Sequence, residues 1–174
     1  MSAGDRLELV HADITTLDVD AIVNAANAAL APGGGVCGAI HLAAGAELAE
    51  ACRDVAPCPT GEARITPGFL LKARWVIHAV GPVWHGGTHG EPRQLAACYR
   101  AAMAIADEHG LGSIAFPAIS TGIYGFPLPL ATEIALTSLA AALEGAHRVR
   151  RVVCACFAAP ALDVYRQTRE RLGV

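Results

Sequence analysis

The stretch D-A-I-V-N-A-A-N-A-A-L-A-P-G-G-G-V-C-G-A-I-H-L-A-A-G, from Asp20 to Gly45, carries the pattern on which the fold prediction rests. Its apolar run Ala21–Val23 is typical of a buried strand. The glycine loop Pro32–Gly35 follows, and Val36–Ala44 then has the composition of a helix. A strand, a glycine loop and a helix in this order bring backbone N–H groups and a helix N-terminus to one place, where an anion can bind.

The rest of the chain continues the alternation of strands and helices. Further strands are expected at 6–14, 63–66, 75–80, 113–116 and 149–157, and further helices at 46–55, 93–109, 130–143 and 161–172. Loops are expected at 81–92 and 118–127. This order predicts an α/β fold with helices on both faces of the sheet, in one domain spanning residues 1–174. Ligands of such sheets bind outside the carboxyl ends of the strands.

The composition narrows the class of protein. Of 174 residues, 53% are hydrophobic and only 17% are charged, which excludes a disordered chain. The net charge of −3 gives no reason to expect nucleic acid as the main partner. No apolar run is long enough to span a bilayer and no signal peptide is recognised, so we expect a cytoplasmic protein without a membrane partner. We also expect a monomer.

Six cysteines are spread along the chain: Cys37, Cys52, Cys58, Cys98, Cys154 and Cys156. An even number could indicate disulfides, but a chain of this length buries a sufficient core without them. Free thiols are therefore expected. No C-x-x-C pair occurs, so a zinc knuckle is not expected. We expect no metal and no cofactor.

Two glycine-bearing loops are the candidate binding elements, Gly33–Gly38 and Ser120–Gly125. Taken by themselves, these glycines could be turn residues without a role in binding. However, both loops lie in stretches without a Lys or Arg, between Arg6 and Arg53 and between Arg100 and Arg148. A phosphate bound there would be held mainly by amide dipoles, which suits a buried diphosphate and not a nucleic-acid backbone. The Walker-type loop of NTPases is absent.

Several motifs together resemble the macrodomain family, in its MacroD-type subclass. They are Asp13–Thr15, Asp20–Asn27, Gly33–Gly45, Cys58–Ala63, Val76–Pro82 and Ala115–Pro127. The resemblance implies a three-layer α/β/α sandwich around a mixed, mostly parallel six-stranded sheet. It also implies binding of ADP-ribose, with hydrolysis of O-acetyl-ADP-ribose or removal of ADP-ribose from acidic side chains of modified proteins.

The resemblance also assigns roles in ligand binding. Asp13 would accept from the adenine amine beside the Ile14 amide, and Phe157 would pack on adenine. Asn27 would hydrogen-bond the distal ribose. The remaining ligand-binding positions are Gly34, Gly35, Val36, Ser120, Thr121, Gly122, Ile123 and Tyr124. Structural alternatives stay open: Asp13 could cap Thr15 and Thr16, Phe157 could fill the core, and Asn24 could tie down the glycine loop.

The catalytic assignment covers Asn27, Gly35, Cys37 and His41. The resemblance places an aspartate that helps to activate water where this chain has Cys37, and loss of a general base typically slows a reaction by about 10²–10⁴-fold. Cys37 could be a small residue in a weakened hydrolase, part of a non-catalytic ADP-ribose reader, or a reactive thiolate. A zinc site built on Cys37 and His41 would need further ligands. His41 could orient the catalytic loop or be purely structural.

Overall fold

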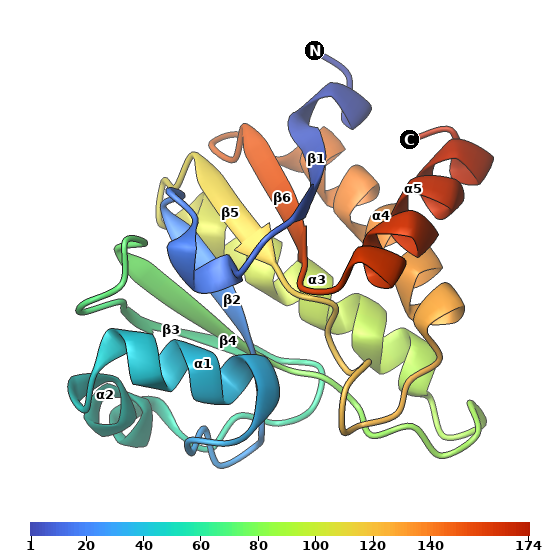
Figure 1. The fold of residues 1–174 in the computed structure, drawn as a ribbon. Helices are drawn as coiled ribbons and strands as arrows, with labels where there is room; N and C mark the ends of the chain where they lie inside the picture. The colour runs from blue at the N-terminus through green and yellow to red at the C-terminus, as the bar shows by residue number, and fades with distance from the viewer.

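A six-stranded sheet between two layers of helices organises the computed structural model, which describes residues 1–174 (Figure 1). The strands are β1 Leu7–His11, β2 Ala21–Ala26, β3 Ala63–Pro67, β4 Trp75–Val80, β5 Ser113–Phe116 and β6 Arg151–Cys156. The α-helices are α1 Gly35–Ala44, α2 Glu47–Val55, α3 Glu91–Glu108, α4 Leu128–Gly145 and α5 Ala159–Leu172. Two 3-10 helices, η1 Gly4–Arg6 and η2 Ile14–Thr16, flank β1. The expected three-layer sandwich is confirmed.

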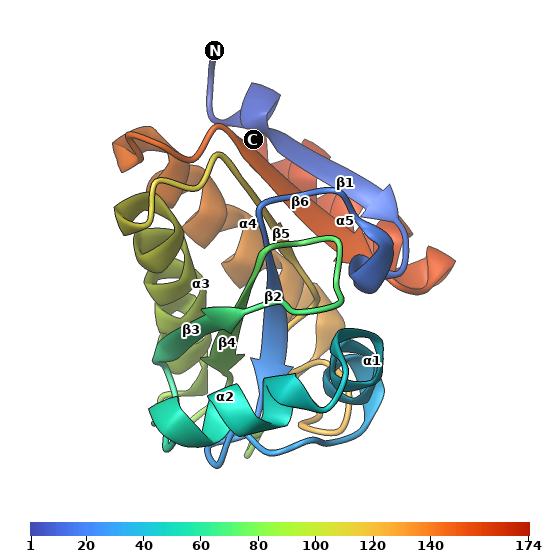
Figure 2. The same cartoon turned by 90° about the vertical axis from the view of Figure 1, so that its left-hand side faces the viewer.

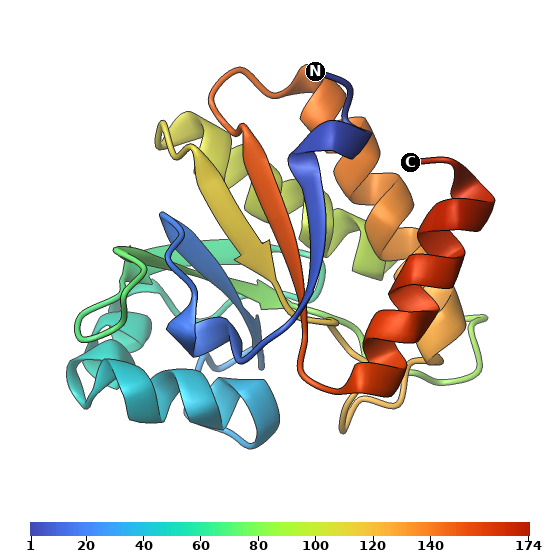
Figure 3. The ribbon, with the colours of Figure 1, turned by 45° about the horizontal axis from the view of Figure 1, so that its top comes forward.

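The strand order is β1-β6-β5-β2-β4-β3, and only β3 runs antiparallel to its neighbour. The five parallel strands therefore end at one edge of the sheet (Figure 3). The segments that follow β1, β2, β4, β5 and β6 all leave the sheet at this edge. Both glycine loops are among them, so the topology brings together segments that are about ninety residues apart in the sequence.

The alternation of side chains along β2 builds two separate cores. Ala21 and Val23 belong to the larger one, which α3, α4 and α5 cover. Ile22 and Ala26 belong to the smaller one, under α1 and α2. Figure 2 shows α1 and α2 on the side of the sheet opposite to α3. Because side chains alternate with period two, Asn24 points to the same face as Ile22, towards α1 and α2.

Proline explains three of the differences between expected and observed boundaries. Helices α3, α4 and α5 begin two residues earlier than expected, because Pro92, Pro129 and Pro160 lie inside their first turns. A helix tolerates proline there, since the first N–H groups have no intrahelical acceptor. The expected strand at 6–14 is too long: β1 ends at His11, and Asp13 then caps η2.

The cysteines and the helices agree with a reduced globular fold. All six cysteines are buried and none forms a disulfide. None of the helices is sufficiently long and apolar to cross a bilayer.

A buried carboxylate, Glu91 at the start of α3, fixes the segment that follows β4. Its Oε2 accepts the backbone N–H groups of His85 at 2.9 Å and Gly87 at 2.8 Å, and its Oε1 accepts that of His89 at 2.6 Å. Burial alone raises the pKa of Glu91, but these hydrogen bonds together with that of its own N–H outweigh burial and hold the pKa at about 2. The carboxylate therefore stabilises this segment in its ionised form.

We expect Glu91→Gln to have a lower free energy of unfolding than the wild type at neutral pH, and this difference (the stability gap) should shrink in acid. A depressed pKa contributes stability above the ordinary value of 4.5, and this contribution is lost as the pH falls towards 2. Urea unfolding followed by tryptophan fluorescence at several pH values between neutral and strongly acid measures the gap. Glu108→Gln, on the exposed end of the same helix, is the control and should show almost no gap. A gap for Glu91→Gln that is independent of pH would contradict this role.

Candidate functional site

A cavity of about 300 Å³ opens at the edge where the parallel strands end. Its lining residues come from the segments after β2, β4 and β5 and from the start of α1: Ala25, Ala26, Asn27, Gly33, Gly34, Gly35, Val36, Cys37, Gly81, Ala118, Ile119, Ser120, Gly122, Ile123 and Tyr124. The lining contains no Lys, Arg, His, Asp or Glu. Two other hollows, between α3 and α4 and beside the end of α5, are not lined by any strand-end loop.

The first wall of the cavity is the N-terminus of α1. Gly34 is the N-cap residue and provides no side-chain acceptor, so the first N–H groups of the helix stay available to a ligand. Gly35 has φ +58°, in the left-handed region that glycine adopts without strain. The positive end of the helix dipole points in the same direction as these N–H groups. This wall therefore presents free N–H groups and no cationic side chain.

The second wall is the Ser120–Tyr124 loop. Ser120 has φ +66°, an uncommon conformation for a residue with a side chain, and its Oγ is buried without a hydrogen-bond partner. The N–H groups of Gly122, Ile123 and Tyr124 donate to no acceptor within the chain. A Cβ on Gly34 would lie 3.7 Å from Ile123 Cδ1, so the two loops face each other across the cavity. Amides from both sides can thus surround one anionic group.

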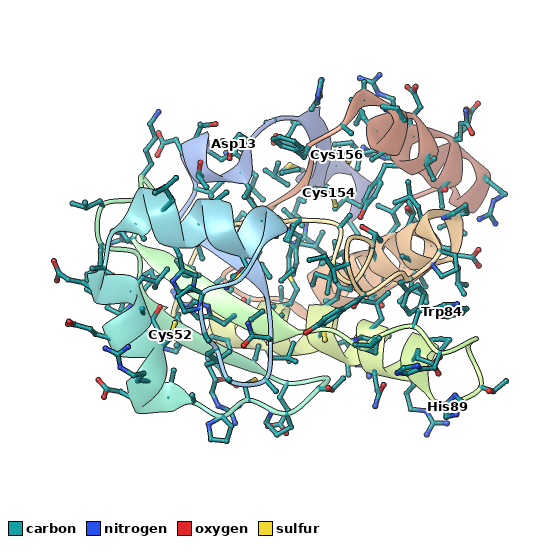
Figure 4. The ribbon with its side chains drawn as sticks, turned by 60° about the horizontal axis from the view of Figure 1, so that its bottom comes forward. Asp13, Cys52, Trp84, His89, Cys154 and Cys156 are labelled. Carbon is teal, nitrogen blue, oxygen red and sulfur yellow. The ribbon has the colours of Figure 1, made fainter.

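Two aromatic side chains hold the second loop in place. The Trp84 ring packs on Phe126 with centroids 4.6 Å apart, and the backbone N–H of Trp84 donates to the Tyr124 carbonyl at 2.8 Å. Figure 4 shows Trp84 and His89 on the segment that leads into α3. The Tyr99 hydroxyl accepts the Ile119 N–H at 3.4 Å from inside the core. The loop is therefore anchored before ligand binds.

Asn27 lines the cavity where β2 ends. Its Nδ2 donates to the Ala31 carbonyl at 2.9 Å, and its Oδ1 accepts the Ala31 N–H at 3.0 Å. One amide proton and one lone pair remain free, which is the donor and acceptor pair that a ribose hydroxyl needs. Asn27 thus shapes the loop and keeps the hydrogen-bonding capacity assigned to it.

Cys37 lies in the first turn of α1 and is 5% exposed at the wall of the cavity. Its thiol donates to the Ala31 carbonyl, with sulfur and oxygen 3.7 Å apart, and its sulfur accepts from Asn24 Nδ2, also at 3.7 Å. These are the partners of a neutral thiol. The geometry shows Cys37 joining helix and loop, as well as contacting the cavity.

His41 does not line the cavity. Its Nε2 is buried without a partner, and burial lowers the pKa of the ring. No group of three or more side chains able to bind a metal forms anywhere in the chain. The structure thus places His41 outside the lining of the cavity, and its role in orienting the catalytic loop stays a prediction.

The predicted adenine end lies beyond the cavity, where β1 and β6 end. Asp13 Oδ1 accepts from the Thr15 N–H at 3.0 Å and from the Thr15 hydroxyl at 2.8 Å, while Oδ2 has no partner in the chain. The capping role of Asp13 is therefore real and leaves one oxygen free. Phe157 is 82% exposed, so core filling is excluded as its role. The Ala12 N–H donates to the Cys156 carbonyl, which joins the two strand ends that Figure 4 shows together.

Five lining residues were not among the predicted site residues: Ala25, Ala26, Gly81, Ala118 and Ile119. Ala26 is paired with Val80, so Gly81 leaves the sheet beside Asn27. Knowing that β2 and β4 are neighbours would have predicted the position of Gly81, but the order of strands in the sheet cannot be determined from the sequence. Thr121, Ile14, Asp13 and Phe157 do not line this cavity.

Comparisons with known proteins agree with the fold. The model of the Macro domain family matches residues 23–135. A Macro domain-containing protein of Chlorobaculum tepidum is 54% identical over 161 residues, covering 92% of this chain and 94% of the relative. The Oceanobacillus iheyensis macrodomain with ADP superposes with a TM-score of 0.91 at 42% identity, covering 95% of this chain and 90% of the other.

A second solved structure gives the same result. The Trypanosoma brucei macrodomain in complex with ADP-ribose superposes with a TM-score of 0.88 at 42% identity, covering 93% of this chain and 68% of the other. The matched family model covers most of the chain, including both glycine loops. This chain belongs to the Macro domain family.

Proposed function

We propose that the chain binds ADP-ribose. The observation that carries this proposal is the cavity between two loops of free backbone amides, which contains no cationic side chain. Preorganised amides suit a buried diphosphate. The macrodomains of Oceanobacillus iheyensis and Trypanosoma brucei, whose structures hold ADP and ADP-ribose, support the choice of ligand.

The proposed orientation of the ligand follows from the positions of the loops. The diphosphate lies against the amides of Gly122–Tyr124, and the distal ribose lies over Asn27 and the start of α1. The adenine extends along the sheet edge to Asp13 and Phe157. Asp13 Oδ2 accepts from the adenine amine there, and the exposed Phe157 ring covers the base.

We further propose that the chain hydrolyses esters of ADP-ribose slowly, in the manner of a MacroD-type enzyme. The substrates are O-acetyl-ADP-ribose or an ADP-ribosylated acidic side chain of a protein. Water attacks the ester carbonyl, which breaks the acyl C–O bond and frees the ribose oxygen, or it attacks the anomeric carbon, which breaks the C1–O bond and frees the carboxylate. A phosphate oxygen of the substrate takes the proton of the water and, in the first case, passes it to the leaving ribose oxygen. The alternative is a reader that binds without turnover. It is favoured by the cavity lining, where Cys37 and Tyr124 are the only titratable side chains and neither is a carboxylate.

Calorimetry and a time course test these proposals in turn. Titration with ADP-ribose should show a 1:1 complex, and absence of heat with intact protein would contradict both the enzyme and the reader. Release of acetate from O-acetyl-ADP-ribose, or of ADP-ribose from a modified protein, then separates the two. A rate equal to that of a heat-inactivated sample would identify a reader.

Replacing Phe157 with alanine should weaken ADP-ribose binding about tenfold. Stacking of a base on an aromatic ring contributes about 1–3 kcal/mol, and this ring is already exposed, so its loss should not disturb the core. Ribose 5-phosphate, which has no adenine, should bind both proteins equally. Leu70→Ala, at an equally exposed residue of the β3–β4 hairpin, is the matched control. Equal loss for both ligands would mean that Phe157 does not contact the base.

A further inference from the structure

A buried polar cluster lies behind the glycine loop, on the face of the sheet that α1 and α2 cover. Asn24 of β2 and His78 of β4 are paired in register, and they are 1% and 0% exposed. Thr66 of β3 and Cys52 of α2 complete the cluster on the side away from the cavity. Figure 4 shows Cys52 on α2, beneath α1. Most polar groups in a core are hydrogen-bonded, so each contact has a direction that can be worked out. In this cluster only Asn24 Oδ1 is buried without a partner.

The hydrogen bonds of His78 determine which ring nitrogen carries the proton. Asn24 Nδ2 lies 3.1 Å from His78 Nδ1, and an amide nitrogen can only donate, so Nδ1 is the acceptor. Nε2 therefore carries the proton and donates to Thr66 Oγ1 at 2.9 Å, while the threonine hydroxyl donates onwards to the Pro67 carbonyl. The ring is neutral in this arrangement, and burial, with a smaller contribution from His41, lowers the pKa of His78 to about 4.

The same amide group of Asn24 reaches the wall of the cavity. Nδ2 has two protons: one goes to His78 and the other points to Cys37 Sγ at 3.7 Å. With its sulfur used as an acceptor, the Cys37 thiol directs its own proton to the Ala31 carbonyl. Asn27 also holds Ala31, because its Nδ2 donates to the Ala31 carbonyl and its Oδ1 accepts the Ala31 N–H. The cluster thus ends on the loop that forms the floor of the distal-ribose site.

We propose that Asn24, oriented by His78, is a positioning residue that acts through Cys37 to hold the Ala31–Gly34 loop in its ligand-binding conformation. The proposal deepens the proposed function, on which its ligand measurements rest. Asn24 does not line the cavity, so it touches no substrate and acts only through Cys37. Because this loop faces only the distal ribose in the proposed orientation, the effect should be confined to ligands that have that sugar.

The first test uses the wild-type protein and needs no ligand. Long-range 15N–1H NMR distinguishes a ring nitrogen that carries a proton from one that does not. At neutral pH, His78 should have a protonated Nε2 and an unprotonated Nδ1. An inverted Asn24 amide would place Oδ1 against Nδ1 and would require the opposite tautomer. Finding the proton on Nδ1 would therefore overturn the proposal, whether or not the chain binds ADP-ribose.

The second test compares two ligands in four proteins. Dissociation constants for ADP-ribose and for ADP, which has no distal ribose, are measured for the wild type, Asn24→Leu, His78→Leu and His78→Asn. Both leucine variants should bind ADP-ribose about tenfold more weakly, an effect of the size that one lost hydrogen bond gives. Their affinity for ADP should change by less than about twofold on the same scale. His78→Asn keeps an acceptor close to the position of Nδ1 and should restore most of the ADP-ribose affinity.

The outcomes separate this proposal from general damage to the core. Equal losses for ADP and ADP-ribose, or no rescue by His78→Asn, would contradict a positioning role. Thermal melting identifies a variant that does not fold, and in that case the tautomer measurement still decides the orientation of Asn24. If the folded wild type binds neither nucleotide, the proposed function fails while the His78 tautomer can still be tested.

Discussion

Replacing Gly81 with alanine is expected to weaken ADP-ribose binding by roughly 10–100-fold, the range that about 1–3 kcal/mol of overpacking produces. Gly81 leaves β4 directly beneath the second loop. A Cβ at this position would overlap Ser120 Oγ and lie 2.6 Å from Ile119 Cγ2. Neither neighbour can move easily, because Ile119 is fully buried and Ser120 is in a strained conformation. The loop must therefore shift, and its amides move away from the diphosphate.

Calorimetry on the folded variant measures this loss. The matched control is Gly145→Ala at the end of α4, where an added Cβ meets no atom within 4 Å and φ is not positive. Its affinity should equal that of the wild type. If Gly81→Ala bound ADP-ribose with unchanged affinity while melting normally, the Ser120–Tyr124 loop would not be the diphosphate site.

The Cys37→Asp variant is expected to hydrolyse O-acetyl-ADP-ribose about 10²-fold faster than the wild type, at the lower end of what a general base contributes. The side chain lies at the cavity wall beside Asn27, so a carboxylate there could accept a proton from water. Asn24 Nδ2 would then donate to the new carboxylate instead of the sulfur. The gain is limited because the Ala31 carbonyl, which now accepts from the thiol, would face the carboxylate without a proton between them.

Two further variants help to interpret the rate of Cys37→Asp. At saturating substrate, Cys37→Ala should retain most of the wild-type rate if the substrate phosphate takes the proton, although its affinity for ADP-ribose should fall as in the Asn24 variant. Loss of all activity would make the thiol itself catalytic. Asn27→Ala should reduce ADP-ribose affinity in every background. A Cys37→Asp variant that binds ADP-ribose normally but gains no rate would leave the reader as the better description of this chain.

Much of the fold could be predicted because the sequence repeats one local pattern. The apolar run Ala21–Val23 indicated a buried strand, although β2 continues through Asn24 to Ala26. Strands of this kind between helices leave few possible architectures. The errors were at boundaries. Pro92, Pro129 and Pro160 were taken to precede their helices, although proline is well accommodated in a first turn.

The candidate site was less completely predictable. Its two loops contain enough glycine to be found by inspection, and the absence of cations around them indicated amides as the binding groups. Gly81 and Ile119 were missed because they join the site through the β2–β4 and β2–β5 pairings, which no local pattern records. The resemblance assigns His41 to the site, but His41 does not line the cavity and its Nε2 atom is buried.

The sequence by itself determined the alternation of strands and helices, the positions of both glycine loops and the cysteine in place of an expected aspartate. These are local properties: hydrophobic period, backbone freedom and residue identity. Only the tertiary structure decided that the two loops face each other, that Phe157 is exposed, and that Cys37 is joined through Asn24 to His78. Such contacts depend on strand order and on the direction of each side chain, which follow from packing two cores onto one sheet.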